Sequence, residues 1–143
     1  MGICIFSKNV SNDIGYGGFK RLRQTVANLC PNEIKNHYNY LQENYIHLLY
    51  NKEDLKKYDE ETERIYSKYR KKGYGKVIDF LYSPDTGATL SYGTAKQLLK
   101  AIGDYNDDII YGYAGWGSDA MRFHHFKEIL EDSYKSKRPW GWR

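Results

Sequence analysis

Apolar residues recur at intervals of three and four positions along most of this chain, which is the spacing of helices with one buried face. Phe19, Leu22 and Val26 follow this spacing as far as Cys30, where Pro31 sets a boundary because a residue before proline avoids the helical region. The spacing resumes after Pro31 at Ile34, Tyr38, Leu41, Tyr45 and Leu48. The sequence therefore predicts two amphipathic helices, one on each side of Pro31.

Three further segments carry the same helical spacing. The first, 53–72, is highly charged, and Gly73 is suited to end it as a C-cap. A second helix is expected to start at Ser91 as N-cap and to end at Gly103, and a third to start at Ser118. The buried faces of these three segments are predicted to be formed by Leu55, Tyr58, Ile65 and Tyr69, by Ala95, Leu98, Leu99 and Ile102, and by Phe123, Phe126, Ile129 and Leu130.

Short extended pieces are harder to recognise. The apolar run 77–82 is rich in β-forming residues, but at this length periodicity does not separate a strand from a short helix. Segment 83–87 has the proline, aspartate and glycine of a turn. We expect a mainly α, compact, α+β-leaning fold with about five helices and one or two short β pieces. It should form a single domain over residues 1–143, with disorder confined to the ends.

Composition narrows the class of protein further. Fifteen tyrosines, five phenylalanines and three tryptophans indicate an ordered globular chain. The net charge of +4, from 22 basic and 18 acidic residues, is too small to indicate nucleic-acid binding. Cys4 and Cys30 fit neither a zinc site nor a disulfide framework, which favours a reducing cytoplasm. With no long apolar run, no membrane partner is expected, and no cofactor is predicted.

Glycine and aromatic residues recur together, most densely at 15–19 and 111–117. The first of these segments precedes a helix with basic first turns, where free amides and the helix dipole attract phosphate or carboxylate. It is not a dinucleotide-binding fingerprint, since no clear strand precedes it, and a plain turn beside a solvated basic face is the alternative. If the two segments converge, aromatic rings would stack on a base while cations hold phosphate. The predicted ligand-binding residues are Tyr16, Gly17, Gly18, Lys20, Arg21, Arg23, Tyr111, Tyr113 and Trp116.

Catalytic and metal-binding signals are weaker. Asp79 and Asp85 are the best candidates for acid–base work, but a surface position and a turn explain them equally well. Segment 104–108 begins like a calcium loop, but Ile109 and Gly115 stand where that loop requires glycine and glutamate. The sequence therefore predicts no catalytic residue and no metal ligand.

Several of these segments suggest a family. The sequence from Gly15 to Arg23, the stretch from Ser83 to Thr94, residues 104–113 and Phe126–Leu130 resemble small uncharacterised proteins of bacteriophages, prophages and their Gram-positive hosts. The likeness skips the charged helix 53–72. In that family, cysteines lie around the turn after Pro84 and near the C-terminus, whereas this chain has none there. The resemblance implies an accessory or counter-defence role in the cytoplasm of a host cell.

Three classes of function follow. The favoured one is a non-enzymatic, phage-type binding protein that sequesters a nucleotide-derived signal, such as a cyclic nucleotide or an ADP-ribose derivative. The alternative is an inhibitor of a host defence protein or complex, comparable to anti-CRISPR proteins, that binds through exposed aromatic residues. A nucleotide-processing enzyme is the least favoured class. A symmetric homo-oligomer is compatible with each of them.

Overall fold

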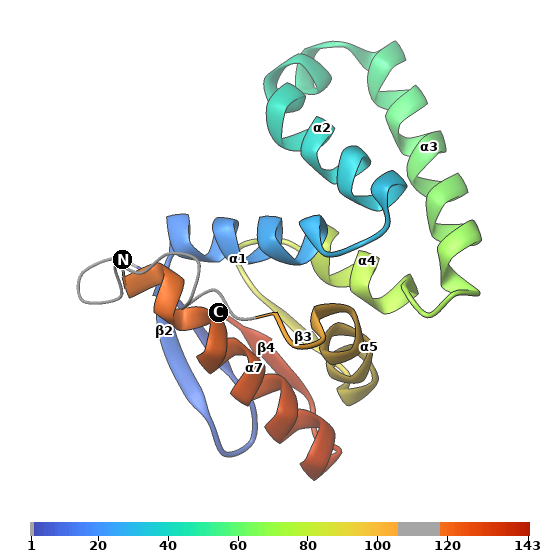
Figure 1. Cartoon of the computed structure of the whole chain (residues 1–143). Helices are drawn as coiled ribbons and strands as arrows, with labels where there is room; N and C mark the ends of the chain where they lie inside the picture. The colour runs from blue at the N-terminus through green and yellow to red at the C-terminus, as the bar shows by residue number, and fades with distance from the viewer. Residues whose placement is uncertain (1, 106–117) are drawn as a thin grey trace.

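The computed structural model describes residues 2–105 and 118–143, and shows six helices and a four-stranded antiparallel sheet within them (Figure 1). The mainly helical fold class expected from the sequence is thereby confirmed. In chain order the elements are β1 (Gly2–Phe6), β2 (Ser11–Gly15), α1 (Tyr16–Asn28), α2 (Asn32–Tyr50), α3 (Lys52–Arg70), α4 (Gly75–Tyr82), β3 (Ala88–Leu90), α5 (Tyr92–Ile102), α7 (Ser118–Ser136) and β4 (Trp140–Trp142).

The sheet joins the two ends of the chain. Its strand order is β2-β1-β4-β3, and the backbone amides of Cys4 and Arg143 each donate to the carbonyl of the other, at 2.9 and 3.0 Å. Trp140 and Trp142 are 0% and 1% exposed. Disorder was expected only at the ends of the chain, but the two tryptophans make this short C-terminal strand part of the core.

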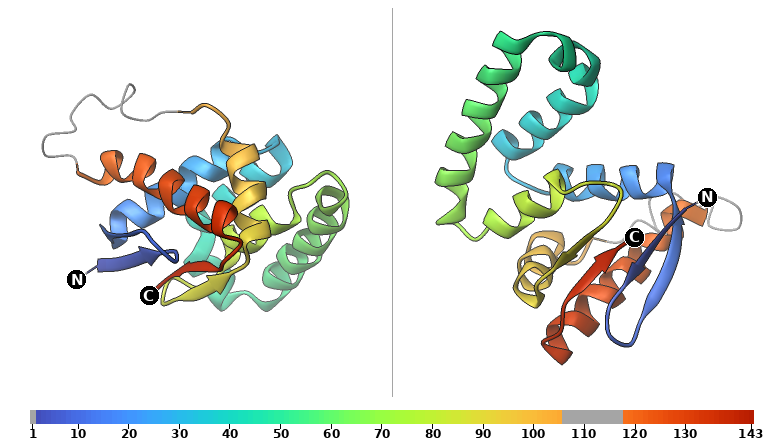
Figure 2. Two further views of the ribbon diagram at one scale, coloured as in Figure 1. Left: turned by 90° about the horizontal axis from the view of Figure 1, so that it is seen from below. Right: turned by 180° about the vertical axis from the view of Figure 1, so that it is seen from behind.

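One face of the sheet is covered by helices. Figure 2 shows α1, α5 and α7 on the same side of the strands. Ile3 and Ile5 of β1 point into this layer and are buried, while Cys4 between them is only half-buried. Such alternation is typical of an antiparallel sheet with one packed face. The hairpin β1–β2 was not predicted, since its only apolar signal is the short opening run of the chain.

Helices α2 and α3 form an antiparallel hairpin that projects away from the sheet (Figure 1). Helix α4 packs between the base of this hairpin and α5. The run 77–82, ambiguous in the sequence, belongs to this helix because Val77, Ile78, Phe80 and Leu81 are all buried against surrounding helices. A short helix buried on most of its surface loses the polar side from which periodicity is recognised.

Most predicted helix ends are confirmed. The side chain of Ser91 accepts from the amide of Thr94, while Gly73 and Gly103 take the positive φ angles of 87° and 59° that favour glycine. The first glycine segment differs from the expectation. Strand β2 ends at Gly15 and α1 begins at Tyr16, so a strand does precede this segment and Gly17 lies inside the first helical turn.

Candidate functional site

A cavity of about 750 Å³ opens where the start of α1 faces α2 and the turn after α4. Three separate stretches of the chain supply its described walls. From α1 these are Tyr16, Gly17, Phe19, Lys20 and Arg23, from α2 Tyr38, Leu41, Gln42 and Tyr45, and from the end of α4 and its turn Leu81, Tyr82, Ser83, Pro84 and Asp85.

The N-terminus of α1 contributes positive potential to this cavity. Within the described residues no side chain caps this helix, and its first turn contains no acidic residue. The first amides of a helix have no carbonyl partner inside the helix, so they carry partial positive charge. Tyr16 is 52% exposed and Lys20 is exposed one turn further along. This end of the cavity can therefore donate hydrogen bonds and charge to an anion.

Arg23 is the most unusual side chain of the site. It is 5% exposed, and its guanidinium carbon lies 4.7, 5.5 and 5.1 Å from the ring centroids of Phe19, Phe80 and Trp142. Its hydrogen bonds to the carbonyls of Leu81 and Pro84 are long, at 3.4 and 3.5 Å, and its Nε has no hydrogen-bond partner among the described residues. Arg23 is thus a buried cation with unused donor capacity.

The counter-charge of Arg23 is weakly held. Asp85 lies 3.2 Å from the guanidinium, but its side chain is 71% exposed. Burial lowers the pKa of Arg23, and the nearby Asp85 carboxylate opposes that shift. The turn that carries Asp85 is itself anchored, because the indole nitrogen of Trp142 donates to the carbonyl of Pro84 at 3.0 Å. An anion could therefore replace Asp85 without rearranging the backbone of the turn.

Tyrosines form the facing wall. Tyr38 is buried, whereas Tyr45 is 58% exposed at the rim. Burial raises the pKa of both Tyr38 and Tyr82 to about 12, so both phenols keep their protons at neutral pH. The wall presents flat apolar rings with neutral polar tips, which suits an aromatic ligand.

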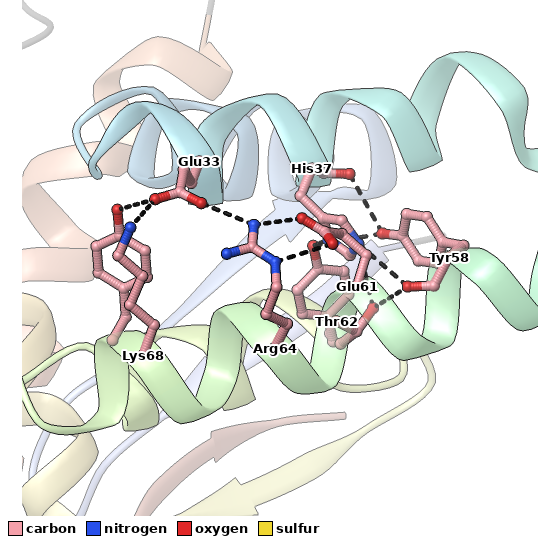
Figure 3. Close-up of polar contacts among 9 residues, drawn as sticks. Glu33, His37, Tyr58, Glu61, Thr62, Arg64 and Lys68 are labelled. Atoms are coloured by element: carbon pink, nitrogen blue, oxygen red, sulfur yellow. Dashed lines mark hydrogen bonds and ion pairs between the residues drawn. The ribbon is translucent and has the colours of Figure 1, made fainter.

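A polar network between α2 and α3 holds this wall in place (Figure 3). His37 stacks on Tyr58 with ring centroids 4.0 Å apart, and its Nδ1 lies 2.7 Å from the hydroxyl of Tyr82. Nearer the start of α2, Glu33 bonds to Arg64 at 2.8 Å and also pairs with Lys68. The hydrogen bonds of Glu33 to these cations lower the pKa of its carboxyl group to about 2.

The structure brings together part of the set predicted from the sequence. Tyr16, Gly17, Lys20 and Arg23 line the cavity, whereas the buried Gly18 and the exposed Arg21 are not among its described lining. The other three predicted ligand-binding residues, Tyr111, Tyr113 and Trp116, lie outside the described residues.

The sequence did not assign the second and third walls to the site. Tyr38 and Tyr45 were expected to be core or rim residues because of their helical spacing, and no signal linked them to residue 16. Segment 83–87 was predicted to be a turn, with Asp85 as a weak acid–base candidate, and was not linked to the ligand-binding residues. That these stretches meet is decided by the packing of α2 and α4 on α1.

The structure adds little support for the catalytic and metal-binding candidates of the sequence analysis. Asp79 is exposed and does not line the cavity, and Asp85 is paired with Arg23. Among residues 2–105 and 118–143, no three or more histidine, cysteine, aspartate or glutamate side chains are placed to hold a metal ion. In the same two ranges, no helix combines the length and apolar character needed to cross a membrane.

No protein-family model, curated protein or solved structure matches this chain. The cavity and its residues are therefore the basis for inferring a function.

Proposed function

We propose that this protein binds a small, anionic, aromatic molecule in the α1–α2 cavity, of the class formed by cyclic nucleotides and ADP-ribose derivatives. The observation that carries the proposal is Arg23, a buried guanidinium that lines a tyrosine-walled cavity and whose Nε has no hydrogen-bond partner among the described residues. The proposed role is binding of the ligand without chemical change.

The size and chemistry of the cavity support a ligand of this class. A volume of about 750 Å³ falls in the range of pockets that enclose drug-sized molecules. Tyr16 and Tyr45 stand at the rim, where their rings are accessible for stacking on a base. Stacking of this kind contributes about 1 to 3 kcal/mol per base.

The positive groups lie where a phosphate would be needed. Lys20, the amides at the start of α1 and the guanidinium of Arg23 all border the same cavity. In this arrangement the phosphate takes the place of the exposed Asp85 carboxylate beside Arg23. A phosphate, like the Asp85 carboxylate, forms charge-assisted and often paired hydrogen bonds with arginine, and Lys20 and the first amides of α1 offer it further donors in the same cavity.

The biological setting is taken from the resemblance to phage proteins. In a counter-defence protein, tight binding without turnover would sequester a nucleotide signal of the host. Mass spectrometry of the ligand after incubation with the protein distinguishes this role from that of a nucleotide-processing enzyme. Only an enzyme would convert the ligand into a product.

The test is calorimetric titration with cyclic nucleotides and ADP-ribose derivatives, alongside the matching nucleosides and inorganic phosphate. We expect binding of at least one nucleotide and much weaker binding of its nucleoside. Lys20→Gln and Tyr45→Ala should each weaken this binding about five- to 150-fold, the effect of losing about 1 to 3 kcal/mol. Asp85→Asn should strengthen it, because the competing carboxylate is removed.

Arg21→Gln is the matched control, since Arg21 is a neighbouring exposed cation outside the described lining of the cavity. It should leave the affinity unchanged. No heat with any nucleotide of the panel would refute the proposal. Equal losses in the Lys20 and Arg21 variants would show that binding depends on surface charge rather than on the cavity.

A further inference from the structure

Tyr38 lies, like Arg23, deeply buried in the wall of the α1–α2 cavity. It is 2% exposed and lies on the same face of α2 as Leu41 and Tyr45, which line the cavity with it. The ring of Tyr38 packs edge-on against that of Tyr82, with centroids 5.8 Å apart and ring planes at 70°. This packing holds the ring, and with it the hydroxyl group, in one position.

The hydroxyl groups of these two tyrosines differ in their partners. That of Tyr82 lies 2.7 Å from Nδ1 of His37. That of Tyr38 forms no hydrogen bond within the described parts of the chain. A buried hydroxyl without a partner costs free energy, which a ligand that accepts from it would restore. The Tyr38 hydroxyl and Nε of Arg23 are thus two unused donors on buried side chains of one cavity.

The Tyr38 hydroxyl and the Arg23 guanidinium approach the same space from two walls. Burial raises the pKa of Tyr38 to about 12, and the charges of Arg23 and Asp85 act on that pKa in opposite directions, so both groups lie near the hydroxyl. Arg23 belongs to α1 and Tyr38 to α2, and these two helices pack against each other. At neutral pH the hydroxyl keeps its proton. It is therefore a donor that faces the guanidinium across the cavity.

We propose that Tyr38 and Arg23 bind the same phosphate of the ligand, one from each wall, and that this pair selects phosphate over carboxylate. This assignment rests on the proposed nucleotide-binding function and names the groups that choose the anion. Phosphate oxygens are arranged as a tetrahedron, so one can face the guanidinium while another accepts from the hydroxyl. The two oxygens of a carboxylate share one plane, which suits a single guanidinium. In keeping with this, Asp85 lies 3.2 Å from Arg23.

The test is titration with inorganic phosphate, cyclic AMP and ADP-ribose, followed by phosphorus NMR, with acetate as a competitor at constant ionic strength. We expect phosphate and at least one of the two nucleotides to bind the wild type. Tyr38→Phe should weaken the binding of each about tenfold or more, the effect of losing one hydrogen bond to a charged group. The affinity for acetate should stay the same in this variant. Thermal unfolding should also match the wild type, because phenylalanine keeps the ring and the lost hydroxyl has no partner among the described residues.

Tyr82→Phe is the matched control, since it removes a hydroxyl from the same wall that already contacts His37. It should leave the affinity for phosphate unchanged. Equal phosphate affinities of the wild type and Tyr38→Phe would overturn the assignment, and the proposed function would stand if a nucleotide still binds. Phosphate binding that depends on Tyr38, without binding of any nucleotide, would support the assignment and refute the proposed function. A wild type that binds neither would refute both.

Discussion

At the scale of single residues, Arg23 shows which properties of a side chain can be predicted from the local sequence and which cannot. Its position in a basic cluster after Gly15 indicated an anion-binding role, but nothing nearby in sequence indicated that it would be buried. The residues that surround its guanidinium are Phe80 and Trp142, which come from distant elements. Charge could be predicted from the local sequence, whereas burial and the stack of aromatic rings depended on tertiary packing.

This environment predicts that Arg23 is also structural. Arg23→Lys should lower the free energy of unfolding by about 2 kcal/mol. Lysine keeps the positive charge, but its ammonium group cannot stack on the aromatic rings as the planar guanidinium does, and it would be poorly solvated in this buried position. Asp85→Asn should cost less than about 1 kcal/mol, since the Asp85 side chain is mostly exposed. Urea denaturation measures both. Equal losses would mean that the ion pair, rather than the stack, stabilises Arg23.

At the scale of elements, the sequence predicted helices well and their contacts poorly. The boundaries of α3 and α5 follow from charge distribution and capping, which are local properties. The network that joins α2 to α3 and α4 was not predicted. No sequence pattern assigns His37 a role, yet it lies 8% exposed against Tyr58, with Thr62 and Tyr82 in hydrogen-bonding contact.

His37 should make the hairpin sensitive to acid. Burial lowers the pKa of His37, so the folded state holds it neutral at pH values where the unfolded chain binds a proton. The unfolded state then binds more protons, and stability must fall as pH decreases. The contribution is complete above about pH 6.5, the pKa of an unperturbed histidine, and is lost as pH falls through the lowered value.

Chemical denaturation of the wild type and of His37→Gln across this pH range tests the point. Glutamine cannot be protonated, so the variant should lack this part of the acid-dependent loss and approach the wild type in stability as pH falls. At pH values above the histidine range the wild type should be the more stable protein. Parallel profiles for the two proteins would show that His37 does not titrate on unfolding.

At the scale of the whole molecule, the last strand closes the fold. β4 lies between β1 and β3, and its tryptophans contact Phe80 and Phe126 in the aromatic core. Its sequence, Trp140-Gly141-Trp142, reads as part of a basic tail when considered alone. Only the pairing with two strands from elsewhere in the chain makes it a central element.

Gly141→Ala should therefore destabilise the whole fold. A Cβ at Gly141 would lie 2.1 Å from the carbonyl oxygen of Ala88, inside the β3–β4 ladder, where backbone cannot give way cheaply. We expect a loss of about 3 kcal/mol or more in the free energy of unfolding. Gly17→Ala is the matched control, since its Cβ would meet nothing within 4 Å and alanine favours the helix. A thermal melt of Gly141→Ala close to that of Gly17→Ala would contradict the prediction.

The sequence by itself determined the described helices other than α4, most of their ends, and the basic, glycine-rich start of α1, because periodicity, capping and charge act over a few residues. The tertiary structure decided the sheet, since pairing between β1 and β4 joins residues that are more than a hundred positions apart and leaves no local pattern. It also decided the cavity, since the residues that face Tyr16 and Arg23 come from α2 and the turn after α4. A binding site formed by distant segments depends on how those segments pack, and packing is a property of the whole chain.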